Sequence, residues 1–223
     1  MRIFLLDVSR GVSLVAMLGY HFFWDLGYFG FIYIRLVTQG VGLTLAQLIG
    51  TSFIIISGMS ARLLTSSQNF GPKFRKRIVK LLIISAIISI VTFIVDQDNF
   101  IFFGILHFLS ICSLISLILV NIEKNYLVFL MFMGTAVVSL SSITFDLPLI
   151  VSWIGLNKNP PITNDFYPLF PWITFYLFGF WSGYFIMKKR NGGSKIISIL
   201  NPKRNRLFNF LRYVGQKSLI IYI

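Results

Sequence analysis

Residues 78–95 read IVKLLIISAIISIVTFIV, eighteen positions in which Lys80 is the single charge. As an α-helix this stretch would be about 27 Å long, close to the thickness of the hydrocarbon core of a bilayer. An apolar stretch of this length predicts a membrane-spanning helix rather than a helix of a soluble core.

The rest of the chain repeats this pattern. Hydrophobic residues make up 56% of the 223 residues and charged residues 12%, and the mean hydropathy is +0.81. These values are typical of polytopic membrane proteins. Apolar windows predict spans at 11–33, 41–64, 78–95, 101–121, 126–145 and 169–187, with a seventh starting near 207. Residues 148–156 are apolar but too short to cross, and we expect them to re-enter or lie at the interface.

The predicted fold is therefore an all-α transmembrane bundle of about seven spans, formed by a single domain over 1–223. The last span is cut short at Ile223, so we expect the domain either to end within the membrane or to be truncated there.

The net charge of +13 is unevenly distributed. Basic residues cluster before the first span and after the second, fourth and sixth, whereas the loops at 34–40, 96–100 and 146–168 carry few of them. This alternation follows the positive-inside rule and predicts a cytoplasmic N-terminus. The basic excess then serves topology and anionic lipid headgroups, and nucleic-acid binding is excluded as its purpose.

Four ionisable residues would share one face of a helix that runs from just before the first span into it. Asp7, Arg10, His21 and Asp25 fall within a stripe roughly 60° wide on a helix of 100° per residue. Arg10 and His21 are roughly 16 Å apart along the axis, so the stripe runs from the cytoplasmic surface to the middle of the membrane. Ionisable groups are costly there and usually have a function.

Each of these residues has two interpretations. His21 with Asp25 one turn later suits a general base oriented by a carboxylate, or merely a hydrogen bond between helices. Arg10, with Asp7 fixing its rotamer, suits a clamp for the phosphates of a cytoplasmic donor, or an anchor for topology.

A second set of candidates is predicted near the outer face. His107 lies in the outer half of its span, where it suits either a substrate site or an interhelical hydrogen bond. Asp165, Tyr167 and Trp172 lie where the chain enters the sixth span from outside. They suit contacts to a polar substrate, and Asp165 equally suits a helix cap.

Five segments, in order, resemble the heparan-alpha-glucosaminide N-acetyltransferase catalytic-domain family. They are DVSRG (7–11) leading to YHFFWDL (20–26), FIIISGMS (53–60), GILHF (104–108), DFYPLFPW (165–172) and GQKSLIIY (215–222). The spacing of Arg10 and His21 also resembles a pattern of the related acyltransferase-three enzymes.

The resemblance implies a multi-pass enzyme, here expected in a prokaryotic cell membrane. It would transfer an acetyl group from cytoplasmic acetyl-CoA to the amine or hydroxyl of an amino sugar or glycan outside. His21 and Asp25 would then be catalytic, and Arg10 and Asp7 would bind the donor. His107, Asp165, Tyr167 and Trp172 would line the acceptor side. In animal members the favoured catalytic histidine follows the first span, where Gly27 to Gly40 contains none, so His21 does not inherit that role by position.

The expected partners are acetyl-CoA as co-substrate, the glycan acceptor and membrane lipids, with a homodimer left open and no metal expected. Two other functions stay open from the residues alone. A proton-coupled transporter or flippase could use the His21–Asp25 pair as a proton relay. A membrane haem protein could ligate its iron through His21 and His107.

Overall fold

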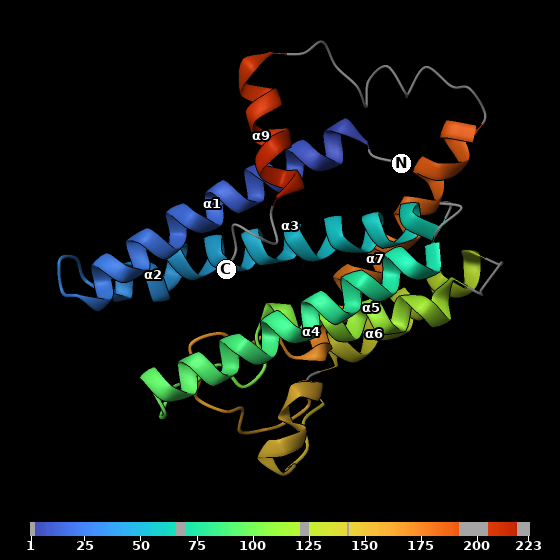
Figure 1. The fold of residues 1–223 in the computed structure, drawn as a ribbon. Helices are drawn as coiled ribbons and strands as arrows, with labels where there is room; N and C mark the ends of the chain where they lie inside the picture. Colours follow the sequence, from blue (N-terminus) through green and yellow to red (C-terminus); the bar gives the residue numbers. More distant parts are fainter. Residues whose placement is uncertain (1–2, 66–69, 121–124, 142, 192–204, 218–223) are drawn as a thin grey trace. The chain divides into compact units, whose positions relative to one another are not determined.

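The computed structural model describes residues 3–65, 70–120, 125–141, 143–191 and 205–217 (Figure 1). Its elements are α1 (Phe4–Tyr28), α2 (Arg35–Thr38), α3 (Gly40–Thr65), α4 (Phe70–Val95), α5 (Ile105–Leu119), α6 (Asn125–Leu140), the 3-10 helix η1 (Leu149–Ile154), α7 (Leu169–Asn191) and α9 (Arg206–Gln216). The described residues contain helices and two isolated β-bridges, and no strand. The all-α prediction is confirmed.

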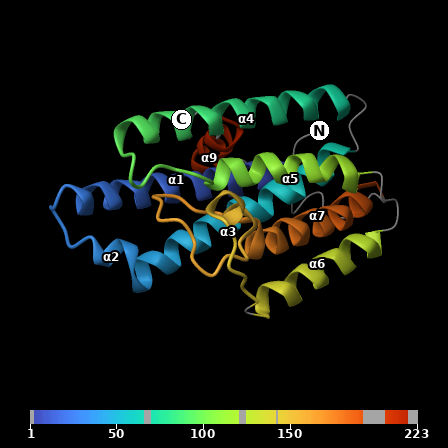
Figure 2. The same ribbon diagram turned by 90° about the horizontal axis from the view of Figure 1, so that it is seen from below.

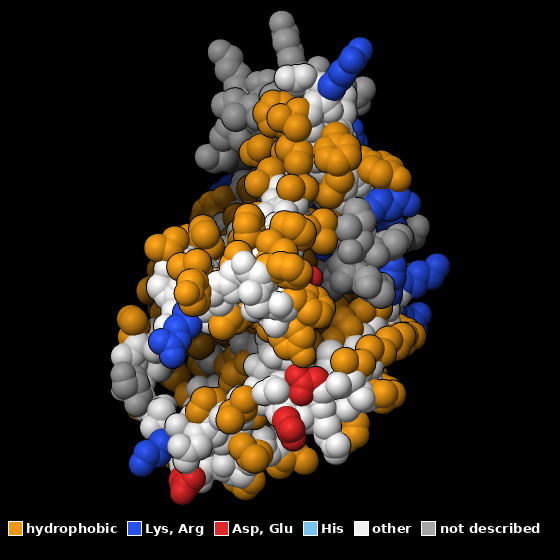
Figure 3. Space-filling view, turned by 90° about the vertical axis from the view of Figure 1, so that its left-hand side faces the viewer, with side chains coloured by type: hydrophobic (Ala, Val, Ile, Leu, Met, Phe, Trp, Pro, Cys, Tyr) orange, Lys and Arg blue, Asp and Glu red, His pale blue; other side chains and the backbone are white. Residues whose placement is uncertain are grey.

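Three of the helices are long and apolar enough to cross a membrane: Gly40–Thr65, Phe70–Val95 and the Leu169–Lys188 part of α7. Two shorter apolar helices, α5 and α6, accompany them. Large hydrophobic side chains are widely exposed, among them Tyr33 and Val95, and Figure 3 shows one face on which they gather. Such a surface suits lipid rather than water, and the fold is that of a helical membrane bundle. The number of seven spans stays a prediction.

Several helix boundaries differ from those predicted. The first helix covers 4–28 rather than 11–33, and α4 begins at Phe70 rather than at 78. In both cases the helix continues through charged residues that a hydropathy window excludes. Helix α5 is shorter than 101–121 because residues 101–104 are not helical. The apolar stretch 148–156 contains η1, and the end of the predicted seventh span, 218–223, lies outside the described residues.

The chain divides into two compact units, residues 1–56 with 189–223 (unit 1) and residues 57–188 (unit 2). In unit 1, α9 crosses α1 (Figure 1), and Leu14, Met17 and Val214 form a buried cluster there. Two glycines permit this crossing. A Cβ on Gly11 would overlap the carbonyl oxygen of Leu211, and one on Gly215 would overlap that of Asp7.

Unit 2 is organised around buried serines and aromatic rings. Helices α4 and α5 lie side by side (Figure 2). Ser110, Ser113 and Ser116 of α5 are buried, and each donates to the carbonyl four residues earlier. The hydroxyl of Ser116 also lies 2.7 Å from that of Tyr176 on α7. Small hydroxyl residues of this kind allow membrane helices to approach closely.

The glycine crossing can be tested with alanine. In Gly11→Ala the new methyl group meets backbone that cannot move without separating α1 from α9, so we expect a cost of about 1–3 kcal/mol. Gly19→Ala is the matched control on the same helix, because no atom lies within 4 Å of its Cβ position. Thermal unfolding in detergent should show a clearly lower melting temperature for Gly11→Ala than for Gly19→Ala. Equal melting temperatures would contradict the close crossing.

Candidate functional site

The continuous helix α1 carries all four residues of the predicted stripe, in different environments. Asp7 is buried, Arg10 is half-buried, and His21 and Asp25 are exposed. The end of the stripe with Asp7, here called the inner end, therefore packs inside unit 1. The end with His21 and Asp25, the outer end, is exposed.

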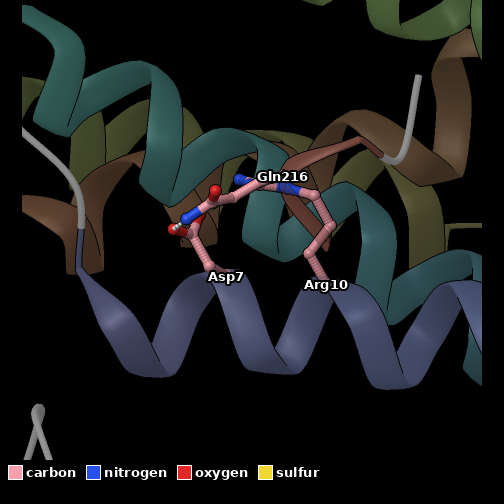
Figure 4. A network of polar contacts seen from close by, with 3 residues as sticks. All are labelled: Asp7, Arg10 and Gln216. Atoms are coloured by element: carbon pink, nitrogen blue, oxygen red, sulfur yellow. Dashed lines mark hydrogen bonds and ion pairs between the residues drawn. The ribbon is translucent and has the colours of Figure 1, made fainter. Parts of the chain in front are cut away.

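At the inner end, Asp7 joins α1 to α9 (Figure 4). Its Oδ1 lies 3.3 Å from Nη1 of Arg10, and its Oδ2 accepts a hydrogen bond of 3.1 Å from Nε2 of Gln216. Both carboxylate oxygens are thus engaged, and the carboxylate orients the guanidinium as the sequence predicted. Gln216 was not predicted, because it lies 209 residues after Asp7 and nothing local links them. Donor binding by Arg10 and Asp7 stays a prediction.

At the outer end, His21 and Asp25 project from α1 one turn apart. Within the described part of the chain, neither side chain has a hydrogen bond. The ring of Tyr20 packs edge-on against that of His21, with centroids 5.9 Å apart, and its hydroxyl donates to the carbonyl of Val37 at 3.3 Å. The imidazole of His21 is therefore held beside an anchored ring with both nitrogens available.

His107 is different, because both of its ring nitrogens are hydrogen-bonded. Nδ1 accepts the backbone N–H of Gly104 at 3.3 Å, which requires that Nε2 carries the proton. Nε2 then donates to Oγ of Ser89 at 3.1 Å, and Ser89 donates to the carbonyl of Ile101 at 2.7 Å. The ring closes the start of α5 and ties it to α4.

Asp165 binds the same helix start from the other side. Its Oδ2 accepts the backbone N–H of Ile105 at 3.1 Å, and a Cβ on Gly104 would overlap this oxygen. Thr163 and Tyr167 continue the attachment by donating to the carbonyls of Phe100 and Phe103. Burial raises the pKa of Asp165 to about 6, although the bond from Ile105 acts in the opposite direction. Asp165 is thus a cap for α5, and its predicted contact with an acceptor is untested.

Tyr167 and Trp172 form an aromatic pair at the entry to α7. Their ring centroids lie 4.8 Å apart, and both residues are half-buried. The helical geometry of α7 is interrupted at Phe170, between Pro168 and Pro171. Trp153 of η1 packs against Phe103, with centroids 5.9 Å apart. The role of Trp153 could not be predicted, because its contact depends on how the segment between α6 and α7 folds back.

The raised pKa of Asp165 makes stability depend on pH. Well below pH 3.8, Asp165 is protonated in both the folded and the unfolded protein, so its burial carries no electrostatic penalty. Between pH 3.8, the usual pKa of an aspartate, and about pH 6, Asp165 ionises in the unfolded protein but stays largely protonated in the folded one. The free energy of unfolding therefore falls across this range, by at most about 3 kcal/mol. We expect Asp165→Asn to remove this loss, so that its melting temperature falls less than that of the wild type between pH 4 and 7. Asp98→Asn, an exposed neighbour, is the control, and identical pH curves for all three proteins would contradict the assignment.

No group of three or more His, Cys, Asp or Glu side chains that could hold a metal ion occurs among the residues that the structure describes.

Comparison with curated proteins and with solved structures gives no match. A family model described as heparan-alpha-glucosaminide N-acetyltransferase, catalytic, matches residues 2–223. This match covers both units and all the segments on which the resemblance rests. The chain therefore belongs to the heparan-alpha-glucosaminide N-acetyltransferase catalytic family and is a membrane acetyltransferase.

Proposed function

We propose that this protein transfers an acetyl group from cytoplasmic acetyl-CoA to an amino sugar or glycan on the outer side of the membrane, with His21 as general base. The family match over residues 2–223 carries the proposal. It also weakens the case for the transporter and haem alternatives. Iron ligation by His107 would in addition require that a ring nitrogen give up its present hydrogen bond.

The choice of His21 follows from the two histidines of the chain. A general base needs an imidazole nitrogen that can reach a substrate proton. His107 uses Nδ1 and Nε2 to hold the start of α5, whereas His21 has no hydrogen bond within the described residues. Asp25, one turn later, supplies the negative charge that stabilises an imidazolium.

The proposed reaction is acyl transfer from a thioester. The acceptor nitrogen or oxygen attacks the acetyl carbonyl carbon, and the bond from that carbon to sulfur breaks as CoA leaves with its thiol sulfur. The proton of the attacking amine or hydroxyl passes to His21, and Asp25 stabilises the resulting charge until that proton passes on to the CoA thiolate, which leaves as the free thiol. Arg10, about 16 Å towards the cytoplasm, is proposed to bind the donor with Asp7. Tyr167 and Trp172 offer aromatic faces for the acceptor.

Replacing the base tests this assignment. We expect His21→Ala to lower kcat by about 10²- to 10⁴-fold, because proton transfer by a positioned side chain contributes that much. The assay is transfer of radiolabelled acetyl from acetyl-CoA to glucosamine by purified protein, with added imidazole as a rescue. His107→Gln is the matched control. It should lower the melting temperature, since it removes a helix cap, but should lower kcat far less than His21→Ala does. Unchanged turnover in a folded His21→Ala would overturn the proposal.

A further inference from the structure

Arg62, in the last turn of α3, is a charged residue that the sequence did not single out. It is 6% exposed, and its Nε is buried without a hydrogen-bond partner in the described structure. The guanidinium lies over the rings of Phe180 and Tyr184, 5.2 and 5.5 Å from their centroids. Gly183 makes room for it, because a Cβ there would lie 2.9 Å from Cβ of Arg62.

The charge of Arg62 has no carboxylate near it among the described residues of unit 2. Asp96, Asp98, Asp146 and Asp165 all belong to loops predicted to face outward, whereas the end of α3 is predicted to lie on the cytoplasmic side. Glu123, the remaining acidic residue of this unit, lies outside the described residues. A buried cation without a partner is costly, so a bound anion would relieve the cost.

A second arginine approaches the same helix. Nη2 of Arg77, from α4, donates to Oγ of Ser57 at 2.6 Å, and its guanidinium lies 6.0 Å from the ring centroid of Phe74. Ser57 precedes Arg62 by five residues, or about 7.5 Å along α3. Ser57 accepts one of the five N–H groups that a guanidinium offers. Guanidinium groups that lie over aromatic rings and keep unused N–H donors are suited to bind the oxygens of a phosphate.

We propose that Arg62, assisted by Arg77, binds a phosphate group of the acetyl donor on the cytoplasmic side of unit 2. The assignment rests on acetyl-CoA being the donor. Arg10, the arginine predicted from sequence, already faces the carboxylate of Asp7, whereas the guanidinium of Arg62 lies over two aromatic rings and has no ion pair among the described residues. The group bound is a phosphate monoester or diester, and either the acetyl donor or a lipid headgroup could supply it.

The experiment compares two donors in a maltoside detergent that contains no phosphate. Acetyl-CoA carries phosphate groups, and S-acetylpantetheine carries the same thioester without them. For Arg62→Gln and Arg62→Lys we expect the KM of acetyl-CoA to rise, at least tenfold for Gln and less for Lys. Their KM for S-acetylpantetheine and their kcat should stay unchanged. Arg75→Gln removes one charge from the exposed surface of α4 and should change neither KM.

Other results overturn the proposal. If Arg62→Gln weakens both donors equally, the role of Arg62 is structural. If the effect appears only in nanodiscs with phosphatidylglycerol, the phosphate is that of a lipid. Glu123→Gln tests the carboxylate that the structure does not describe. We expect its effect on the melting temperature to add to that of Arg62→Gln, and a strongly non-additive pair would identify Glu123 as the partner instead.

Failure of the proposed function would look different. The wild type would then be inactive with both donors, and the phosphate site would be tested by binding alone. We expect CoA and inorganic diphosphate to raise the melting temperature of the wild type and of Arg75→Gln, but not that of Arg62→Gln. Equal shifts in all three proteins would overturn the site.

Discussion

Hydrocarbon offers no hydrogen bonds, so polar side chains on membrane helices must find their partners within the protein. This constraint explains how the helices of each unit are joined. In unit 1, Asp7 engages Arg10 and Gln216 where α1 and α9 cross on two glycines. In unit 2, His107 and Asp165 accept hydrogen bonds from the backbone N–H groups at the start of α5. They tie this helix to α4 and to the segment that precedes α7.

The same constraint separates structural from functional residues. Most polar groups in the described helices are paired, as Ser116 is with Tyr176. Among the described helices, His21 and Asp25 on α1 have no hydrogen bond. Nε of Arg62 on α3 is buried without a partner, as are Oδ1 of Asn125 on α6 and Nε of Arg212 on α9. An imidazole with a nearby carboxylate suits proton transfer, and a buried guanidinium suits an anion. Both chemistries are needed in the proposed transfer of an acetyl group from a phosphorylated thioester donor.

The sequence was sufficient for the class of fold and for the family, because apolar windows and short motifs are local properties. It placed the start of α1 too late, because Asp7 and Arg10 pair with each other inside the helix and hydropathy counts them only as charges. An interhelical hydrogen bond was one of the two interpretations of His107, and the structure shows it, but its partner Ser89 could not be named because it comes from another helix. Arg62 was overlooked for a different reason: a basic residue at the predicted inner end of a span is typical of topology, and only its burial distinguishes it.

Transfer across a sealed membrane tests the central claim most directly. Wild-type protein and His21→Ala would be reconstituted into liposomes with glucosamine trapped inside, and radiolabelled acetyl-CoA would be added outside. For molecules oriented with the cytoplasmic face outward, we expect N-acetylglucosamine to accumulate in the lumen with the wild type and one free CoA to be released outside for each acetyl group transferred. His21→Ala should produce neither. Solute movement by the wild type without consumption of acetyl-CoA would contradict the account and indicate a transporter.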